Sequence, residues 1–304
     1  MSKRGNRQAE FTKWMGPVLD ALRNFSGSAK PREIYKWIGE KHQIPEKILN
    51  ERYAKSGQLK FPNQIAWAKQ YLVWEKLVEA SKHGVWALTK KGWTTKLNEK
   101  ESHDIFLHWV KVFQELRENK SSTTAKAAEK IIEREEIGEP EENPSSNPTL
   151  IEVLQNISDT GFEHLCGRLL REYDFENIEI TQRSHDGGID GYATLKLNPF
   201  VNLSAYFQCK RYKGSVPTKD VQAFIGVMET NKRSVEKGIF LTTGSFSKNA
   251  FDIEKANIKL ELIDGDKLVE MFEKVELGVT LKKEYIPDLS FFEQYRDNKE
   301  KHIR

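Results

Sequence analysis

The sequence contains little cysteine: Cys166 and Cys209 are the two among 304 residues. Both lie within apolar patterns, which disfavours a disulfide framework or a cysteine-based zinc site and favours a reducing compartment. No apolar run approaches the length that crosses a membrane, and no apolar segment follows the basic start as in a secretory signal. These absences predict a soluble, cytoplasmic protein without membrane contact.

Charged residues are plentiful but unevenly distributed. Residues 1–100 hold 20 Lys and Arg against 9 Asp and Glu, a surplus of 11 positive charges. Residues 101–150 hold 6 against 11, and residues 151–304 hold 22 against 25. A chain of this length has room for two domains, each with its own core. The first hundred residues are therefore the candidate surface for a polyanion such as double-stranded DNA.

The basic first part of the chain is predicted to fold as three helices and a hairpin. Apolar residues recur at helical spacing within 11–22, and Pro31 suits the first turn of a second helix. A third helix is expected from Pro62 to Ala80, and strands within 77–88 would pair across a short turn. Three helices followed by a basic hairpin describe a winged helix, in which the third helix enters the major groove and the hairpin contacts phosphate.

The third helix and the hairpin carry the candidate DNA contacts. Side chains on the helix can bond to bases, and basic side chains near the hairpin suit phosphate. An ordinary solvated face is the alternative, but a surplus of 11 charges exceeds what solubility requires. A stripe of Trp67, Tyr71 and Trp74 on the same helix is predicted to belong to the core. The expected DNA contacts are Asn63, Gln64, Lys69, Lys82, His83, Lys90 and Lys91.

The second part of the chain is predicted to be a separate domain behind a linker. The linker is rich in Glu, Ser and Pro and poor in aromatic residues, which is typical of a flexible, acidic tether. An amphipathic helix then begins at Ser158 or Asp159, and strands and helices follow in an order that predicts a mixed sheet with helices on both faces. The fold class expected is α/β (α+β) with two domains. The predicted limits are 1–112 for the winged helix, 113–148 for the linker, 149–280 for the second domain and 281–304 for a tail.

One stretch of the second domain holds the residues that can carry chemistry. A Gly-rich turn from Asp186 to Gly191, which includes Asp190, opens a predicted hairpin whose returning strand ends in Gln208-Cys209-Lys210. Residues two apart on a strand share a face, so the amide of Gln208 and the ammonium of Lys210 are expected to project together near the Asp190 carboxylate. Such a group suits a hard metal ion beside a phosphate. A polar hairpin end with a solvated lysine is the alternative.

Further motifs accompany this set in order. Phe162-Glu163 comes first, then DGGIDG, then Gln208-x-Lys210, VQAF and GIFLTTGSFS. Over residues 149–279 this order resembles the catalytic domain of the Mrr restriction endonuclease family, a branch of the PD-(D/E)xK nucleases in which Gln stands where a second acid is usual. The first domain is similar to the winged helix of that family through GQL, the helix around Trp67, and Trp86-x-Leu88-Thr89.

The resemblance implies a restriction-endonuclease-like fold and a DNA endonuclease of a defence system. It implies hydrolysis of phosphodiester bonds in modified, methylated double-stranded DNA, with Mg²⁺ as cofactor and Mn²⁺ as a substitute. We also expect a homo-oligomer, a dimer or higher. The alternative function is that of a DNA-binding or regulatory protein with a non-cleaving nuclease-like domain, against which the intact Asp190, Gln208 and Lys210 set argues.

Roles follow from the resemblance residue by residue. Asp190 matches the metal-binding acid, Gln208 matches the second metal ligand, and the backbone carbonyl of Cys209 can add a third oxygen. Lys210 matches the catalytic lysine that positions the water, and Glu163 matches a helix acid found near the metal in many relatives. Because Gln208 is neutral, metal affinity should be lower than with two carboxylates.

The residues of the Gly-rich turn have expected roles as well. Asp186 either ligates a second metal ion or caps the turn, and the cap is favoured. Gly187, Gly188 and Gly191 are expected to let the backbone bend tightly and approach DNA closely.

Overall fold

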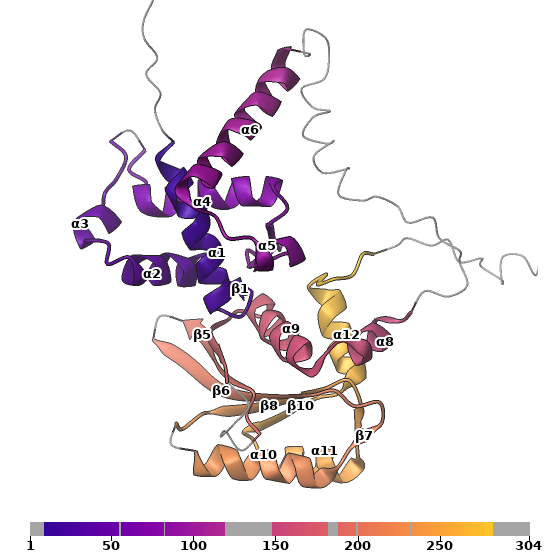
Figure 1. Ribbon diagram of the computed structural model, residues 1–304. Coiled ribbons are helices and arrows are strands. Elements are labelled where there is room, and N and C mark those ends of the chain that lie inside the picture. The colour runs from indigo at the N-terminus through magenta and orange to yellow at the C-terminus, as the bar shows by residue number, and fades with distance from the viewer. Residues whose placement is uncertain are drawn as a thin grey trace, which may run out of the picture.

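The computed structural model describes residues 9–54, 56–81, 83–118, 148–181, 188–198, 200–231 and 233–281. It consists of a helical N-terminal domain and a C-terminal domain built on a mixed sheet, which confirms the predicted α/β two-domain class (Figure 1). The predicted tail, apart from Leu281, and residues 119–147 of the predicted linker lie outside the described residues. None of the described helices is both long and apolar enough to cross a membrane.

The N-terminal domain has the helices and hairpin that the sequence predicts. Its elements are η1 (Glu10–Trp14), α1 (Met15–Asn24), β1 (Ser28–Ala29), α2 (Pro31–Lys41), α3 (Glu46–Leu49), α4 (Lys60–Trp74), β2 (Val78–Ala80), β3 (Trp86–Leu88), α5 (Lys90–Thr94) and α6 (Glu99–Glu118). The strands form a small antiparallel sheet in the order β1-β3-β2. The apolar faces of α1, α2 and α4 meet in one core around Leu19, Ile34 and Ile65, all fully buried. This packing places α4 third among the main helices, directly before the β2–β3 hairpin.

Helix α4 ends at Trp74, so the predicted continuation to Ala80 is wrong. Lys76 has a φ of 55°, in the left-handed region, and the backbone N–H of Leu77 donates to the carbonyl of Leu72 at 2.9 Å. These features close a helix and turn the chain into β2. Helix α6 runs to Glu118, past the domain limit predicted at 112.

The predicted aromatic stripe on α4 is only partly core. Tyr71 is buried, and Trp74 packs against the core beneath Trp109 of α6, at 5.5 Å between ring centroids. Trp67 is 50% exposed, so its predicted burial is wrong. Helix α6 covers the C-terminal half of this stripe and leaves the N-terminal half open.

The C-terminal domain is a five-stranded sheet between two layers of helices. Its elements are α8 (Leu150–Asn156), α9 (Asp159–Glu172), β4 (Phe175–Ile180), β5 (Gly191–Asn198), β6 (Val201–Lys210), β7 (Ser215–Val216), α10 (Thr218–Thr230), β8 (Lys237–Thr242), β9 (Ser245–Phe246), α11 (Lys248–Ala256), β10 (Leu260–Ile263) and α12 (Gly265–Lys274). The strand order is β10-β8-β6-β5-β4, with β4, β5 and β6 antiparallel and β6, β8 and β10 parallel. Helices α8, α9 and α12 cover one face, and α10 and α11 cover the other (Figure 1).

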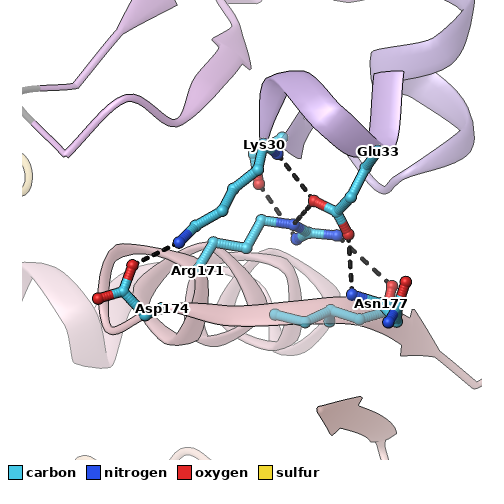
Figure 2. Close-up of polar contacts among 7 residues, drawn as sticks. Lys30, Glu33, Arg171, Asp174 and Asn177 are labelled. Atoms are coloured by element: carbon cyan, nitrogen blue, oxygen red, sulfur yellow. Dashed lines mark hydrogen bonds and ion pairs between the residues drawn. The ribbon is translucent and has the colours of Figure 1, made fainter. Parts of the chain in front are cut away.

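The two domains meet where α9 ends. Arg171 of α9 is completely buried, and its Nε lies 3.8 Å from Oε2 of Glu33 at the start of α2 (Figure 2). Oε1 of Glu33 accepts a hydrogen bond from the backbone N–H of Asn177 at 2.9 Å. Nearby, Lys30 forms an ion pair with Asp174 at 2.5 Å. This cluster of charges joins α2 of one domain to α9 and β4 of the other.

Burial affects the charge of Arg171 without removing it. Desolvation lowers the pKa of the guanidinium to about 10, while Glu33 opposes the shift. The guanidinium therefore remains charged at neutral pH. Its Nε makes no hydrogen bond with any described residue.

The β2–β3 hairpin also contacts the second domain. The hydroxyl of Ser81 donates to Oε2 of Glu172 at 2.7 Å, and Glu79 pairs with Arg168 at 2.5 Å. The hairpin predicted to contact phosphate thus has its edge strand β2 and the start of its turn against α9.

Candidate active site

The start of β5 and the end of β6 bring the predicted catalytic residues together. Gly191 pairs with Phe207 in the antiparallel register, which sets Asp190 beside the last residues of β6. The backbone N–H of Asp190 donates to the carbonyl of Phe207 at 3.0 Å. Oδ2 of Asp190 accepts from the backbone N–H of Cys209 at 2.7 Å. The Asp190 carboxylate is therefore held in place by the backbone of β6.

Gln208 contributes a buried amide next to this carboxylate. Its side chain is 6% exposed, and its Oε1 has no hydrogen-bond partner among the described residues. Buried polar atoms of folded proteins nearly always have partners, and an unpaired one costs about 1–3 kcal/mol. Among the described residues, the hydrogen-bonding capacity of this oxygen is therefore unmet.

Two glycines of the predicted turn make room for the protein's own side chains. Gly188 has a φ of 100°, and a Cβ there would lie 2.9 Å from Nε2 of Gln208. A Cβ on Gly191 would lie 2.2 Å from the ring of Phe207. The space expected to admit DNA at these two positions is occupied by Gln208 and Phe207. Asp186 and Gly187 lie outside the described residues.

Lys210 shares its face of β6 with Gln208 and meets an acid from α10. Its Nζ lies 2.9 Å from Oδ2 of Asp220, and the hydroxyl of Tyr212 donates to the same oxygen at 2.9 Å. Burial alone would raise the pKa of Asp220, but these two hydrogen bonds and the lysine charge outweigh it and lower the pKa. The bond to Asp220 raises the pKa of Tyr212. Asp220 therefore stays ionised and holds the Lys210 ammonium.

Asp190, Gln208 and Lys210 line one hollow of about 390 Å³, and Asp220 lies outside its lining. Glu163 reaches it from α9 and is buried. The residues predicted to be catalytic or to bind metal that line this hollow are Asp190, Gln208, Lys210, Glu163 and Cys209.

Residues that the sequence patterns did not single out complete the walls. Arg211 donates through Nε to Oδ1 of Asp159 at 3.1 Å, and both line the hollow. Arg211 and Tyr212 directly follow Lys210 in the sequence, and Asp220 lies in the first turn of the next helix. Their closeness to Lys210 in the sequence could have pointed to Arg211 and Tyr212. The contact between Lys210 and Asp220 could not be foreseen, because it depends on how α10 packs against the sheet.

Cys209 can serve a metal ion only through its backbone. Burial, followed by the neighbouring thiol of Cys166, raises the pKa of the Cys209 thiol well above its ordinary value. Both cysteines are free and buried. The thiol therefore remains neutral, which leaves the backbone carbonyl as the group that fits the predicted role.

The donor set fits a hard cation. Asp190 provides a carboxylate, and Gln208 provides a buried amide oxygen that has no partner among the described residues. Oxygen donors are those that Mg²⁺ prefers. Across the described parts of the chain, no three His, Cys, Asp or Glu side chains form a group that could hold a metal ion. The predicted metal ligands are of another kind: one carboxylate, one amide oxygen and one backbone carbonyl oxygen.

The side chains on α4 that are predicted to contact DNA differ in how many partners they already have within the chain. Gln64 accepts from the indole N–H of Trp14 and donates to Glu10, both at 2.9 Å. Lys69 places its ammonium 5.5 Å from the ring centre of Trp86, and burial lowers the pKa of Lys69. The side chain of Asn63 makes no hydrogen bond with another described residue. Their contacts with DNA stay predictions.

The residues near the hairpin that are predicted to contact DNA also differ in their partners and exposure. Lys91 donates to the carbonyl of Glu75 at 3.2 Å and pairs with its carboxylate at 3.7 Å. His83 and Lys90 are exposed, and Lys82 lies outside the described residues. The roles of these residues toward phosphate also stay predictions.

Comparisons with known proteins agree on one family. A family model described as a restriction endonuclease matches residues 154–272, and a model of the Mrr N-terminal domain matches residues 11–97. The type IV methyl-directed restriction enzyme EcoKMrr of Escherichia coli (strain K12) is 24% identical over 306 residues, covering 93% of this chain and 98% of that protein.

Solved structures resemble the chain more weakly. The DNA modification-dependent restriction endonuclease AspBHI has a TM-score of 0.37 at 16% identity, covering 67% of this chain and 56% of that one. The MspJI restriction endonuclease, in complex with a 27-mer oligonucleotide, has a TM-score of 0.31 at 16% identity, covering 66% and 54%. This chain spans little more than half the length of either, and at such TM-scores neither informs the geometry of the site.

Proposed function

Because the chain belongs to the Mrr restriction endonuclease family and is a type IV-like restriction endonuclease, we propose that it hydrolyses phosphodiester bonds of double-stranded DNA in the hollow beside Asp190. The observation that carries this proposal is the buried Oε1 of Gln208, which lacks a partner among the described residues. An unsatisfied oxygen beside a fixed carboxylate has a clear use as a metal ligand. A purely structural hairpin end would have no need of one.

In this proposal Asp190 and Gln208 hold a divalent metal ion through side-chain oxygens, with the Cys209 carbonyl as a further donor. When bound there, Mg²⁺, or Mn²⁺ in its place, supplies positive charge beside the scissile phosphate. Lys210 adds a second positive charge and orients the attacking water. Asp220 keeps the ammonium of Lys210 in position until a phosphate competes for it.

The substrate and its binding surface form the second part of the proposal. The N-terminal domain holds the DNA through its surplus of positive charge, because the second domain carries a small negative excess. EcoKMrr of E. coli is described as methyl-directed, which supports methylated DNA as the substrate here. We further propose that the enzyme works in the cytoplasm as a homo-oligomer.

Cleavage of plasmid DNA tests the chemistry. Wild-type protein should cleave methylated plasmid in the presence of Mg²⁺ and not in EDTA, with products followed on gels. Asp190→Ala and Lys210→Ala should each reduce the rate about 100-fold or more, since each removes charge at the reacting phosphate. Both variants should still bind DNA, because affinity comes mostly from the other domain.

Matched controls are available on α11. Asp252 and Lys255 form an exposed pair at 3.8 Å, away from the hollow. Asp252→Ala and Lys255→Ala should cleave as wild type does. Wild-type cleavage by Asp190→Ala or Lys210→Ala would remove that residue from the mechanism. Binding without cleavage by the wild type would favour a non-cleaving DNA-binding protein.

A further inference from the structure

Helix α4 exposes a tryptophan that the fold does not use. Trp67 is 50% exposed, while Tyr71, one turn later, packs against Phe11 at 5.0 Å between ring centroids. Neither a ring contact nor a hydrogen bond to another described residue involves the Trp67 indole. On the same outward side of the helix, Asn63 is one turn away. A large apolar ring left in water is a feature of binding surfaces.

The exposed indole forms one wall of a hollow. The hollow has a volume of about 670 Å³ and lies between η1, α4 and the segment after α3. Phe11, Tyr53 and Trp67 give it aromatic walls. Glu10 and Asn63 contribute polar groups at its edge. Such a combination of flat apolar surface with a few polar groups is typical of sites for small ring-shaped ligands.

Some polar groups of this hollow can form further hydrogen bonds. Gln64 uses both ends of its amide, toward Trp14 and toward Oε2 of Glu10. The second carboxylate oxygen of Glu10 and the whole amide of Asn63 have no hydrogen bond to another described residue. The hollow therefore offers a fixed acceptor, an amide that both donates and accepts, and an indole face.

This chemistry selects one part of a nucleic acid. The carboxylate of Glu10 repels a phosphate, and the ammonium of Lys60 over the Tyr53 ring is paired with Glu51 at 2.5 Å, so the backbone of DNA is a poor occupant. The major-groove edges of cytosine and adenine each present an amino donor, which a carboxylate or an Asn oxygen can accept. A methyl group on C5 of cytosine or on the amino group of adenine lies at the same edge, where an aromatic face can cover it. The surplus of positive charge in this domain favours DNA over a protein partner.

We propose that the hollow beside Trp67 is where this chain reads a methyl group on a base edge in the major groove. Trp67 covers the methyl group, and Glu10 and Asn63 accept from the neighbouring amino group. Gln64 holds Glu10 in place from the side of Trp14. This inference rests on the proposed function, because it presumes that α4 lies on DNA.

Binding by the full chain in EDTA, where no cleavage is expected, tests the inference. The probes are duplexes of one sequence that carry 5-methylcytosine, N6-methyladenine or no methyl group, followed by fluorescence anisotropy. The wild type should prefer one of the methylated duplexes. Trp67→Ala should weaken binding to that duplex about tenfold more than binding to the unmethylated one, within the range of a single base contact. Trp67→Phe should retain part of the preference.

Leu107 provides a matched control. It is 48% exposed on α6, an apolar side chain of the same domain that does not line the hollow. Leu107→Ala should keep the full preference for methylated DNA. An unchanged preference in Trp67→Ala would overturn the inference, and so would equal weakening on both duplexes, which would make Trp67 a general DNA contact. A wild type that cleaves plasmid with Mg²⁺ but shows no methyl preference would overturn this inference alone, whereas one that neither binds nor cleaves DNA would overturn the proposed function too.

Discussion

The hollow beside Asp190 and the contact between the domains each bury a polar group that has no hydrogen bond to another described residue. In the hollow the group is Oε1 of Gln208, and in the contact it is Nε of Arg171. Gln208 lines a space of about 390 Å³ that also holds Asp190 and Lys210. Arg171 is enclosed between helices, with Glu33 on the facing side. The first group belongs to a side chain that lines a hollow, while the second already has its opposite charge within the chain.

The unpaired oxygen of Gln208 is expected to serve the function of the protein, whereas the unpaired nitrogen of Arg171 accompanies a structural ion pair. An unpaired oxygen facing a hollow lowers stability until a ligand arrives, and active sites commonly carry such a cost. A buried ion pair gives little net stability, because desolvation offsets the attraction, but it fixes how two surfaces meet. Changes at Gln208 should therefore affect catalysis first, and changes at Arg171 should affect stability first.

The largest effect is expected at the domain contact. Arg171→Ala leaves Glu33 buried without its partner and should lower the free energy of unfolding by about 3–5 kcal/mol. All seven tryptophans lie between Trp14 and Trp109, so urea unfolding followed by tryptophan fluorescence reports on the N-terminal domain and its contact. The double variant Glu33→Gln, Arg171→Met should recover part of the loss, because it removes both charges and keeps an oxygen that accepts from the backbone N–H of Asn177.

An exposed ion pair serves as the control for this loss. Arg233 and Glu179 pair at 3.1 Å with side chains 50% and 62% exposed. Arg233→Ala should cost less than about 1 kcal/mol, since such pairs are screened by water. A similar loss in Arg171→Ala and Arg233→Ala would contradict the structural role given to Arg171.

At Gln208 the main effect should be on the rate of cleavage. Gln208→Ala should reduce it about 100-fold, because the metal loses an oxygen donor. Gln208→Glu preserves that donor and adds a charge, so part of the Mg²⁺-dependent cleavage should survive. Rates measured on plasmid DNA across a Mg²⁺ series compare the three proteins. Equal activity of the Ala and Glu variants would mean that position 208 does not bind the metal.

A third substitution separates the rate from stability. Gln208→Leu removes the unpaired amide from a buried position, so it should unfold at the same or a higher urea concentration than the wild type. It should nevertheless cleave as poorly as Gln208→Ala. A large loss of stability would instead show that the amide has a structural partner.

Much of the candidate site follows from local sequence rules. Alternation along β6 puts Gln208 and Lys210 on one face, and the turn before β5 puts Asp190 beside them. Motif order added Glu163, which no local rule would have joined to β6. All four residues line the same hollow, although their roles in metal binding and catalysis stay predictions.

The contact between the domains could not be predicted in this way. The apolar stripe of α9 from Phe162 to Tyr173 accounts for the face toward the sheet, and Arg171 falls outside it. Arg171 is buried because α2 of the other domain covers a second face of α9. The predicted burial of Trp67 was wrong for a related reason. Helical spacing places Trp67 in an aromatic stripe, but it does not show that α6 covers only part of that stripe. Both misses depend on packing between segments far apart in the sequence.

The smallest effect is expected for two lysines on the surface, one without and one with a partner among the described residues. Lys90 is exposed and forms no ion pair with any described residue, whereas the ammonium of Lys91 is shared between the carbonyl and the carboxylate of Glu75. Each phosphate contact contributes a slope of about −0.9 to the dependence of log K on log salt. Lys90→Ala should therefore make the slope of DNA binding by the full chain shallower by about 0.9, if Lys90 reaches a phosphate as predicted. Lys91→Ala should change it less, because Glu75 already neutralises part of that charge. Anisotropy titrations at several salt concentrations measure both slopes, and a larger change for Lys91 than for Lys90 would mean that the pair with Glu75 opens when DNA binds.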